Sequence, residues 1–408
     1  MENPKIRFKG FTKDWEQRKF SELYARSSEK NDGSIGMDKN ITVATMQFKN
    51  DVKVSTTEYL KTYYTFKLGD IAFEGHQSKE FRYGRFVEND IGNGIVSHIF
   101  AVFRPIQEYD LYFWKYAINN ETLMQRILAR STKASTMMHD LVTNDFLNET
   151  FLVPSVKEQK QIGAFLNKLD NIITLHQRKC EQTKKLKKYM LQKMFPRNGA
   201  KVPEIRFDGF TYDWEQRKLG DIYGSIGNAF VGTATPYYAE HGHFYLESNN
   251  VKDGQINHNA EIFINDEFYE KQKDKWLHTG DMVMVQSGHV GHAAVIPEEL
   301  DNTAAHALIM FRNPKEEIEP YFLNYEYQTD KAKKQIENIT TGNTIKHILA
   351  SDMQEFVVDI PKYEEQKVIA SYFCNLDNLI TLHRRAYYNK KGGLTNVHND
   401  NQQYYAIL

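Results

Sequence analysis

A long segment with the periodicity of a packed helix runs from about residue 157 to residue 195. Apolar or seam-compatible residues recur there at alternating steps of four and three: Ile162, Leu166, Leu169, Ile173, His176, Cys180 and Thr183. This 3.5-residue period indicates a helix that packs along one narrow seam. Pro154 and Pro196 flank the segment, as expected at helix ends. Roughly 38 helical residues at ~1.5 Å each span about 57 Å, which is more than one globular domain requires.

A second segment repeats this pattern near the end of the chain. Its seam positions are Ile369, Phe373, Leu376, Ile380, His383 and Tyr387. Two such helices pack most simply on each other, as an intramolecular coiled coil, and the alternative is that each packs on its own globular neighbour. The adjacent Gly392 and Gly393 cost a helix roughly 2 kcal/mol relative to alanine. We therefore expect the second helix to end there, about two or three turns short of the first, before a polar tail.

Two globular stretches, residues 20–153 and 219–360, precede these helices. Both mix short apolar runs, bounded by turn residues, with amphipathic stretches. The strand-like runs include 99–103, 262–264 and 282–285, and the helical stretches include 111–128 and 321–339. We interpret each globular stretch as an α+β domain.

The chain contains a long internal repeat. Residues 4–19 (PKIRFKGFTKDWEQRK) and 203–218 (PEIRFDGFTYDWEQRK) are identical at 13 of 16 positions. Residues 158–176 and 365–383, in the two helices, are identical at 11 of 19 positions. Fainter echoes are HIFAVFR at 98–104 against HALIMFR at 306–312, and Gly69-Asp70-Ile71 against Gly280-Asp281-Met282. The protein therefore consists of two halves of about 200 residues, each with an arm, a globular domain and a long helix.

The two halves diverge selectively. The arms and helix starts are nearly identical, whereas the globular domains differ. A shared frame that holds two different recognition units in fixed geometry produces this pattern. Duplication followed by neutral drift is the alternative, and it explains the two halves but not why only some segments stayed similar.

Composition narrows the class of protein and its compartment. The 52 Lys+Arg and 53 Asp+Glu give a net charge of −1, although a balanced total can conceal a basic face. The two cysteines, Cys180 and Cys374, exclude a disulfide scaffold and fit a reducing cytoplasm. No apolar run reaches the roughly 18–20 residues of a membrane span, and the N-terminus lacks the pattern of a signal peptide. We expect a cytoplasmic protein with no membrane partner.

Catalytic signals are weak. Ser287 stands near His289, but the flanking residues do not match the nucleophile elbow of serine hydrolases. Phosphate-binding loops and the dinucleotide fingerprint are absent from the sequence. A group of histidines lacks both the HExxH frame and partnering cysteines, so loop and core positions explain it better than a metal site does: His241, His243, His289, His292 and His306. We expect no catalytic residues and no metal site.

Two loops suit binding better. Each follows an apolar strand and places small, flexible residues beside polar or cationic ones. The first offers His76, Gln77, Ser78, Lys79, Arg82 and Arg85, and the second offers Gln286, Ser287 and His289. Gln can pair with adenine edges, Arg or Lys with guanine edges, and Ser or Lys with phosphates. The alternative is a polar hairpin turn that merely needs glycine.

A third pair of segments has similar hydroxyl and cationic content. Its candidates are Lys133 in the first half and Thr341, Asn343, Thr344 and Lys346 in the second. Phosphate contact and a capped helix start explain this pattern equally well. The end of the first long helix is basic, with Lys184, Lys185, Lys187, Lys188 and Lys193. This run is either a solvated face or a part of the helix that lies near DNA or near an acidic partner.

Together these motifs resemble type I restriction-modification specificity subunits. The WEQRK arm, the G-D-I/M strand and the EQKxI…LDNxITLH helix each occur twice, TGNTIKH lies at 341–347, and the resemblance covers the chain to about residue 385. It implies an α+β fold with two target recognition domains in a pseudo-twofold repeat. Two long antiparallel helices, which form an intramolecular coiled coil, would separate these domains.

The resemblance also implies a function. The chain would recognise a bipartite sequence in double-stranded DNA, one half-site per domain, without catalysis or a cofactor of its own. It would dock two methyltransferase subunits and, with them, two restriction–translocation subunits; these partners would use S-adenosylmethionine, ATP and magnesium. The loop residues above are the DNA-binding candidates. The partner-binding candidates are Leu169, Ile173, His176, Leu376, Ile380 and His383.

The predicted domain limits are an arm (1–19), a first recognition domain (20–153), a first spacer helix (154–197), a linker with the repeated arm (198–218), a second recognition domain (219–360), a second spacer helix (361–391) and a polar tail (392–408). One alternative is a standalone or decoy DNA-binding protein that lacks full partner assembly because of its atypical C-terminus. Another is a protein–protein scaffold with no nucleic-acid role. Salt-dependent binding to polyanions separates the DNA-binding hypotheses from the scaffold.

Overall fold

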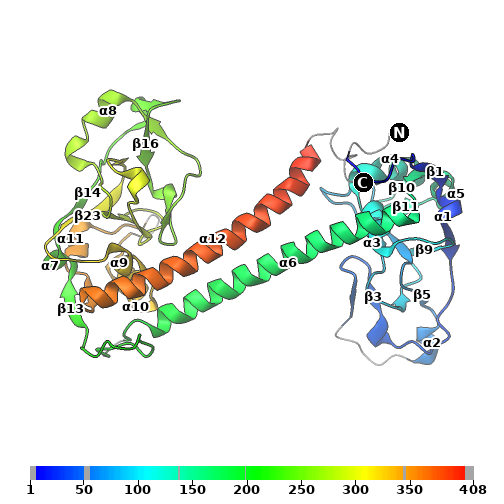
Figure 1. The fold of residues 1–408 in the computed structure, drawn as a ribbon, viewed down its shortest axis with the longest axis horizontal. Helices are drawn as coiled ribbons and strands as arrows, with labels where there is room; N and C mark the ends of the chain where they lie inside the picture. The colour runs from blue at the N-terminus through cyan, green and yellow to red at the C-terminus, as the bar shows by residue number, and fades with distance from the viewer. Residues whose placement is uncertain (1–5, 50–55, 137, 198, 343–345, 400–408) are drawn as a thin grey trace. The chain divides into compact units, whose positions relative to one another are not determined.

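The computed structural model describes residues 6–49, 56–136, 138–197, 199–342 and 346–399, and over 386–399 it describes the backbone alone. The chain forms two compact units, which we call unit 1 (residues 1–176 and 386–408) and unit 2 (residues 177–385) (Figure 1). The division falls inside one long helix. The segment predicted as the first spacer helix therefore belongs to both units.

Short strands and helices alternate along the first half. Its elements are β1 (Glu16–Lys19), α1 (Phe20–Leu23), β2 (Tyr24–Ser27), β3 (Ile41–Thr42), β4 (Gln47–Phe48), α2 (Thr57–Leu60), β5 (Tyr64–Phe66), β6 (Ile71–Glu74), β7 (Arg85–Glu88), β8 (Gly94–Val96), β9 (Ala101–Pro105), α3 (Leu111–Ile118), α4 (Glu121–Ser131), β10 (Thr132–Ala134), β11 (His139–Leu141), α5 (Thr143–Asn148), β12 (Thr150–Val153) and α6 (Val156–Lys193).

The second half follows a similar order. Its elements are β13 (Glu215–Lys218), α7 (Leu219–Ile222), β14 (Tyr223–Asn228), β15 (Tyr238–Ala239), β16 (His243–Leu246), β17 (Val251–Lys252), β18 (Gln255–Ile256), β19 (Phe263–Ile264), α8 (Asp266–Glu270), β20 (Met282–Val285), β21 (Ala293–Val295), β22 (Ala304–Ala305), β23 (Leu308–Pro314), α9 (Pro320–Glu326), α10 (Asp330–Ile339), α11 (Ala350–Gln354), β24 (Val357–Ile360) and α12 (Tyr363–Asn399). The predicted α+β class is confirmed.

Each unit is built around a four-stranded antiparallel sheet with the same strand order. The order is β2-β9-β6-β7 in unit 1 and β14-β23-β20-β21 in unit 2. The central pairs also correspond in register, with Ile71 opposite Phe103 and Met282 opposite Phe311. All four of these side chains are fully buried. The two globular domains thus share a framework that their sequences barely reveal.

The units differ in what lies between the strands of this framework. Between β14 and β23, unit 2 inserts a second four-stranded sheet of order β15-β19-β16-β22. Between β2 and β9, unit 1 has only the two-stranded pairs β3–β4 and β5–β8 among its described residues. The structural difference between the two units therefore lies in the insertions into a common sheet.

An aspartate fixes the turn into the central strand of each sheet. The Oδ2 atom of Asp70 accepts a hydrogen bond from the backbone N of Lys67 at 2.8 Å, and Oδ2 of Asp281 accepts one from the backbone N of His278 at 2.8 Å. The glycines before these aspartates have φ values of 86° and 88°, a conformation that favours glycine. Backbone geometry thereby explains the repeated Gly-Asp pair.

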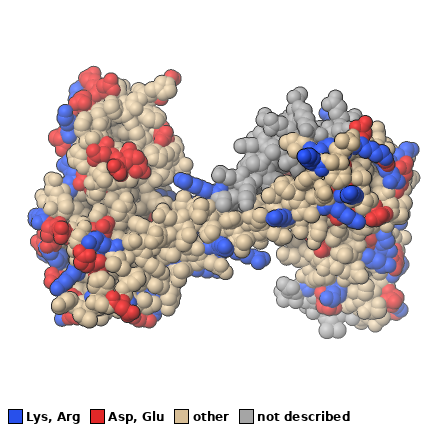
Figure 2. All heavy atoms as spheres, viewed as in Figure 1, with Lys and Arg blue, Asp and Glu red and all other residues tan. Residues whose placement is uncertain are grey.

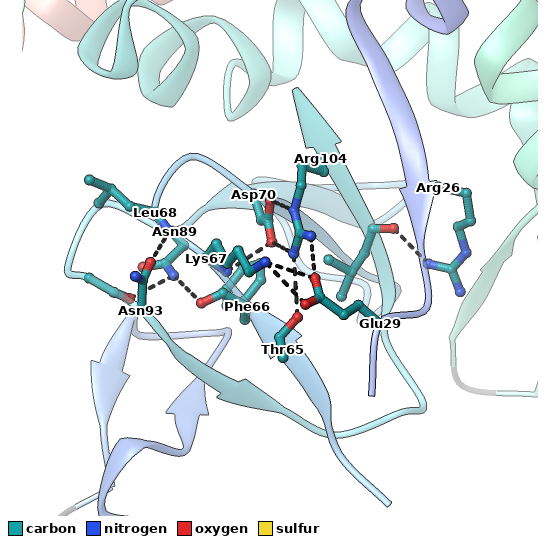
Figure 3. A network of polar contacts seen from close by, with 12 residues as sticks. Arg26, Glu29, Thr65, Phe66, Lys67, Leu68, Asp70, Asn89, Asn93 and Arg104 are labelled. Atoms are coloured by element: carbon teal, nitrogen blue, oxygen red, sulfur yellow. Dashed lines mark hydrogen bonds and ion pairs between the residues drawn. The ribbon is translucent and has the colours of Figure 1, made fainter. Parts of the chain in front are cut away.

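In unit 1 the same aspartate anchors a polar network (Figure 3). Arg104 donates to both carboxylate oxygens of Asp70, at 2.9 Å from Nε and 2.8 Å from Nη2, and it also pairs with Glu29. Hydrogen bonds from Arg104 and Lys67 lower the pKa of Glu29 to about 2. In unit 2 the corresponding Arg312 donates instead to backbone carbonyl oxygens. The repeated Phe-Arg motif therefore lies on equivalent strands, but its arginine binds carboxylates in unit 1 and backbone carbonyl oxygens in unit 2.

The repeated arm closes each globular domain. Strand β1 pairs with β12, and β13 with β24, so the first and last strands of each domain lie together. Arg7 donates to both carboxylate oxygens of Glu158 at 2.8 and 2.7 Å, and Arg206 donates to both of Glu365 at 2.7 Å. Both glutamate side chains are only 2% exposed. Buried, bidentate pairs of this kind have high geometric specificity.

The residue after each glutamate ties the helix start to the domain. Gln159 donates its side-chain amide to the carbonyl of the proline five residues earlier and accepts from the backbone N of Asp110 at 3.1 Å. Gln366 makes the same two contacts, with its own proline and with the backbone N of Glu319 at 3.0 Å. Asp110 and Glu319 are the N-caps of α3 and α9. The repeated Glu-Gln dipeptide thus has two structural roles.

In unit 2 the end of α6 and the start of α12 lie side by side (Figure 1). Cys180 contacts Ile380 and Lys187 contacts Asp377, and Phe195, just after the end of α6, packs against Phe373. The Lys187 Nζ lies 2.7 and 2.8 Å from the two carboxylate oxygens of Asp377. Residue numbers fall along α12 as they rise along α6, so the predicted antiparallel packing is confirmed for this part of the helices.

Packing on the globular domains occurs as well. Ile162 and Leu166, at the start of the predicted seam, are buried in the core of unit 1. Leu191, Met194 and Phe195, at the end of α6, are buried in the core of unit 2. The two packing modes predicted as alternatives are therefore both present.

The second helix is longer than predicted. Helix α12 continues through Gly392 and Gly393 to Asn399 and has 37 residues, against 38 in α6, so the prediction of an early end was wrong. The glycine pair costs about 2 kcal/mol of propensity, but extending an existing helix avoids the cost of nucleation. The boundary between helix and tail moves from residue 391 to Asn399, and residues 400–408 lie outside the described part of the chain.

Replacing Arg206 with methionine should destabilise the closure of unit 2 by about 3–5 kcal/mol, because it leaves the Glu365 carboxylate buried and unpaired. Hydrogen exchange of β13 and β24 in the intact chain measures this effect. Lys201→Met is the matched control, since Lys201 and Asp213 form a pair whose side chains are 76% and 62% exposed. We expect the control to cost less than about 1 kcal/mol; equal loss of protection in both variants would contradict the prediction.

Candidate nucleic-acid interface

In unit 1 the loop after β6 meets the hairpin of β10 and β11. The backbone N of His139 donates to the carbonyl oxygen of Gly75 at 2.8 Å, and His76 and Met138 form an isolated bridge. The side chains of residues 76–80 are exposed, as is that of Lys133 on β10. Two segments that the sequence predicted separately thus form one exposed surface.

Glycine makes this close approach possible. A Cβ atom on Gly75 would lie 2.1 Å from the carbonyl oxygen of His139. A Cβ atom on Gly84 would lie 2.6 Å from the carbonyl oxygen of Glu74, and Gly84 has a φ of 78°. The turn therefore needs glycine for structural reasons, and it also presents a row of exposed polar side chains.

Unit 2 repeats the arrangement with different residues. The backbone N of Gly288, in the loop after β20, donates to the carbonyl oxygen of Lys346 at 3.1 Å. The backbone N of Ile348 donates to the carbonyl oxygen of Gln286 at 2.9 Å. Strands β6 and β20 occupy the same place in equivalent sheets. Each unit therefore presents a loop and a returning segment at corresponding positions.

Most DNA-binding candidates of unit 1 face solvent: His76, Gln77, Ser78, Lys79, Arg82 and Lys133. The Ser78 hydroxyl accepts hydrogen bonds from the backbone N atoms of Glu80 and Phe81, so it closes the loop on itself. Arg85 is held by the protein, because its Nε donates to Glu74 and its Nη2 to the carbonyl oxygen of Ala44, both at 2.8 Å. Arg85 is thus placed to position the loop.

The candidates of unit 2 fall into two groups. His289, Thr341 and Lys346 are exposed, whereas Gln286 and Ser287 are half-buried. The side-chain oxygen of Gln286 is buried and has no hydrogen-bond partner among the described residues, which is unusual for a native protein. Asn343 and Thr344 lie outside the described residues.

A basic cleft in unit 2 was missed by the sequence reasoning. Its volume is about 990 Å³, and residues 290–293, which follow directly on the predicted loop, line one side. Seven cationic side chains line it, against four carboxylates: Lys184, Lys187, Lys188, Lys252, Lys333, Lys346 and Arg384, against Asp253, Asp330, Glu337 and Asp377. The lysine run on α6 was the only signal of this cleft in the sequence.

The lysine run does not act as a single face. Lys187 is only 11% exposed and is neutralised by Asp377, and Lys193 pairs with Glu204. Lys184 and Lys188 line the same cleft as Lys187, but their side chains are exposed. On the face of the molecule seen in Figure 2, Lys and Arg side chains gather along the helices.

The positive field of the cleft acts on a histidine inside it. Burial lowers the pKa of His292, and the carboxylate of Asp253 opposes this shift. His289, Lys252 and Lys333 lower the pKa of His292 further. Lys252 of β17 and Lys333 of α10 therefore act on His292 from two parts of the cleft wall.

Within the described ranges, no three His, Cys, Asp or Glu side chains are grouped so that they could hold a metal ion. Two of the histidines considered in the sequence are engaged elsewhere: His243 lies 3.0 Å from Asp266, and His306 lies 3.2 Å from Glu247. None of the helices in the described part of the chain is both long and apolar enough to cross a membrane.

The partner-binding candidates lie on or near the helix seam. Leu376 and Ile380 are buried, at 6% and 8% exposed, and Leu376 belongs to the core of unit 2. Leu169, Ile173, His176 and His383 are half-buried. Exposed apolar side chains stand on the same helices beside the seam: Phe165, Leu175, Leu379 and Leu382. The exposed apolar side chains thus stand beside the seam, at positions that the 3.5-residue pattern did not identify as partner-binding candidates.

The family model of the type I restriction modification DNA specificity domain matches this chain twice, over residues 12–185 and 212–389. These two matches cover most of the sequence and coincide with the two halves of the repeat. The chain belongs to this family.

Two curated relatives come from Methanocaldococcus jannaschii. The specificity subunit of the type I restriction enzyme MjaVIII is 26% identical over 286 residues, which are 68% of this chain and 65% of the relative. The match therefore spans slightly less than two thirds of that relative's length. The putative MjaX specificity subunit is 24% identical over 411 residues, which are 91% of this chain and 89% of the relative.

Solved structures share the fold. The S subunit of a type I restriction-modification system from M. genitalium aligns with a TM-score of 0.60 and 14% identity, over 99% of this chain and 98% of that one. A chain from a structure concerned with the assembly and conformational transition of a type I system aligns with a TM-score of 0.50 and 15% identity, over 97% and 98%.

Replacing Gly75 with alanine should separate the loop after β6 from the β10–β11 hairpin, because the new methyl group would overlap the carbonyl oxygen of His139. We expect a local cost of about 1–3 kcal/mol, measured as faster hydrogen exchange over residues 132–141. Gly227→Ala in β14 is the control, since a Cβ atom there meets no described atom within 4 Å. Unchanged exchange in Gly75→Ala would show that the hairpin is not held by this contact.

Proposed function

We propose that this chain is the DNA specificity subunit of a type I restriction-modification complex, and that its two recognition domains read the two parts of a split DNA sequence. The observation that carries the proposal is the pair of equivalent sheets, each presenting a polar loop beside a returning segment. Different side chains on the same framework suit two different half-sites, because base edges differ in their pattern of hydrogen-bond donors and acceptors.

Within this proposal the exposed loop residues contact DNA. The exposed side chains of Gln77, Lys79 and Arg82 contact base edges or phosphates of the first half-site, and those of His289 and Lys346 contact the second. Lys133 and Thr341 suit phosphate contacts. The remaining described candidates, His76, Ser78, Arg85, Gln286 and Ser287, belong to the loops that hold these side chains. Asn343 and Thr344 stay candidates from the sequence.

The two long helices have a separate role in the proposal. They set the spacing between the half-sites and offer docking surfaces to two methyltransferase subunits. The exposed Leu379 and Leu382 on α12 and Leu175 on α6 are better placed for docking than the buried Leu376 and Ile380. Two restriction–translocation subunits join through the methyltransferases. S-adenosylmethionine, ATP and magnesium are used by these partners, in the cytoplasm, and this chain takes no catalytic part.

A decoy function is not proposed. That alternative depended on a second helix that ended early and left the partner surface incomplete. Helix α12 extends to Asn399 and is as long as α6 to within one residue.

The proposal is tested by mapping methylated adenines. The chain would be expressed with a cognate methyltransferase subunit, in a host without other adenine methylation, and N6-methyladenine would be located by single-molecule sequencing. We expect a split motif with one modified adenine in each half. A stable complex that leaves the genome unmethylated would contradict the proposal.

Loop substitutions should change the two halves of the motif independently. Lys79→Ala should relax the first half-site and leave the second intact, and Lys346→Ala should do the reverse, because each loop reads its own half. Loss of one good base contact costs about 1–3 kcal/mol, or roughly 5–150-fold in discrimination. Lys61→Ala removes an exposed lysine outside both loops and should leave the motif unchanged. Altered preference in both halves from one substitution would contradict independent reading.

A further inference from the structure

The basic cleft of unit 2 draws its cations from several elements. Lys184 and Lys188 are four residues apart on α6 and therefore project from the same face of the helix. Lys252 extends from β17 and Lys333 from α10. All four line the cleft, and Lys188, Lys252 and Lys333 are exposed. The helix that begins at the end of the first repeat thus supplies charge to a cleft of the second domain.

The carboxylates in the cleft cancel only part of this charge, because six cations face three carboxylates once the Lys187–Asp377 pair is set aside. Asp377 is engaged by Lys187 in the helix seam, and Asp330 accepts a hydrogen bond from the side-chain amide of Gln192 at 3.1 Å. Lys184 does pair with Glu181, but these side chains are 42% and 63% exposed. Exposed pairs of this kind are worth little and exchange readily for another anion.

The cleft is continuous with the surface proposed to read DNA. Lys346 belongs both to the cleft and to the segment that pairs with the loop after β20. Residues 290–293, which directly follow that loop, form part of the wall. Neutral side chains that donate hydrogen bonds, including Gln255, Asn257 and Asn259, complete the lining. Amide and ammonium donors in combination are typical of contacts to phosphate oxygens.

We infer that this cleft holds the sugar-phosphate backbone of DNA beside the second half-site, with Lys184, Lys188, Lys252 and Lys333 as phosphate contacts. This inference rests on the proposed function and deepens it, because it assigns part of the DNA affinity to α6, outside the recognition domain. Such contacts carry no sequence information. They strengthen binding to any DNA and leave the choice of sequence to the loops.

Counterion release makes the inference measurable. Each neutralised phosphate adds about 0.9 to the slope of log K against log salt concentration for double-stranded DNA. Removing three phosphate contacts should therefore lower this slope by about 2–3. The loss should be the same on every sequence.

The experiment compares two triple variants of the full-length chain. The test variant is Lys184→Gln/Lys188→Gln/Lys333→Gln. The control is Lys179→Gln/Lys185→Gln/Lys334→Gln, which removes three exposed lysines from the same two helices at positions that do not line the cleft. Both variants change the net charge equally. The probe is random-sequence duplex DNA, titrated by fluorescence anisotropy at several salt concentrations, with circular dichroism to verify folding.

We expect the test variant to bind random DNA on the order of 100-fold more weakly at about 0.1 M salt and to lose about 2–3 from the slope, while the control loses less than about 1. Equal losses in the two variants, or no loss in the test variant, would overturn the inference.

Failure of the inference and failure of the proposed function can be told apart. The random duplex needs neither the target sequence nor the methyltransferase. A cleft-specific loss of slope would uphold the inference even if no methylated motif were found. A split motif together with identical behaviour of both triple variants would overturn the inference and leave the proposed function standing.

Discussion

The buried, bidentate arginine–glutamate pair is the contact on which each half of this protein depends. Arg7 with Glu158, and Arg206 with Glu365, join three parts of a domain at one place: the arm that enters it, the strand that leaves it and the first turn of the long helix. The glutamates stand in that first turn, where the helix dipole also favours a negative charge. Because the carboxylates are almost fully buried, removing either partner of the pair would strongly lower the free energy of unfolding. Together with the hydrogen bonds of the adjacent glutamine, this pair fixes the first turn of each helix on its own domain.

Closure by the arm explains how the recognition domains could diverge so far. A four-stranded antiparallel sheet requires apolar residues on its buried face, but it does not specify what is inserted between its strands. Both units keep the same strand order, and both keep the aspartate turn before the central strand. The insertions differ completely, from two short strand pairs to a second sheet. The segments that close each domain and start each helix therefore stayed similar in the two halves. The segments inserted between the strands of the sheet were free to differ.

Sequence reasoning was strongest where the signal was local and periodic. It predicted the first helix at 157–195, close to the observed Val156–Lys193, and it predicted the antiparallel pairing seen in unit 2. It failed where the outcome depends on distant residues. Lys187 continues the 3.5-residue seam but was grouped with a solvated lysine face, since its partner Asp377 is 190 residues away. The cleft was missed for the same reason, because its walls come from several elements whose approach no local pattern records.

The Lys187–Asp377 pair also bears on how the helices keep their register. Asp377 accepts a further hydrogen bond from the Tyr325 hydroxyl at 2.9 Å, and the corresponding Asp170 of unit 1 accepts one from Tyr116 at 2.6 Å. The repeated Leu-Asp-Asn motif therefore holds a tyrosine of the adjoining helix in each half. Apolar side chains of similar volume would stabilise the seam at least as well. Lys187 meets Asp377 in only one alignment of the two helices. A shift of one helix along the other would leave two buried charges unpaired, and this raises the free energy of every shifted alignment. Under the proposed function, in which the helices set the distance between the two half-sites, a defined register is worth more than additional stability.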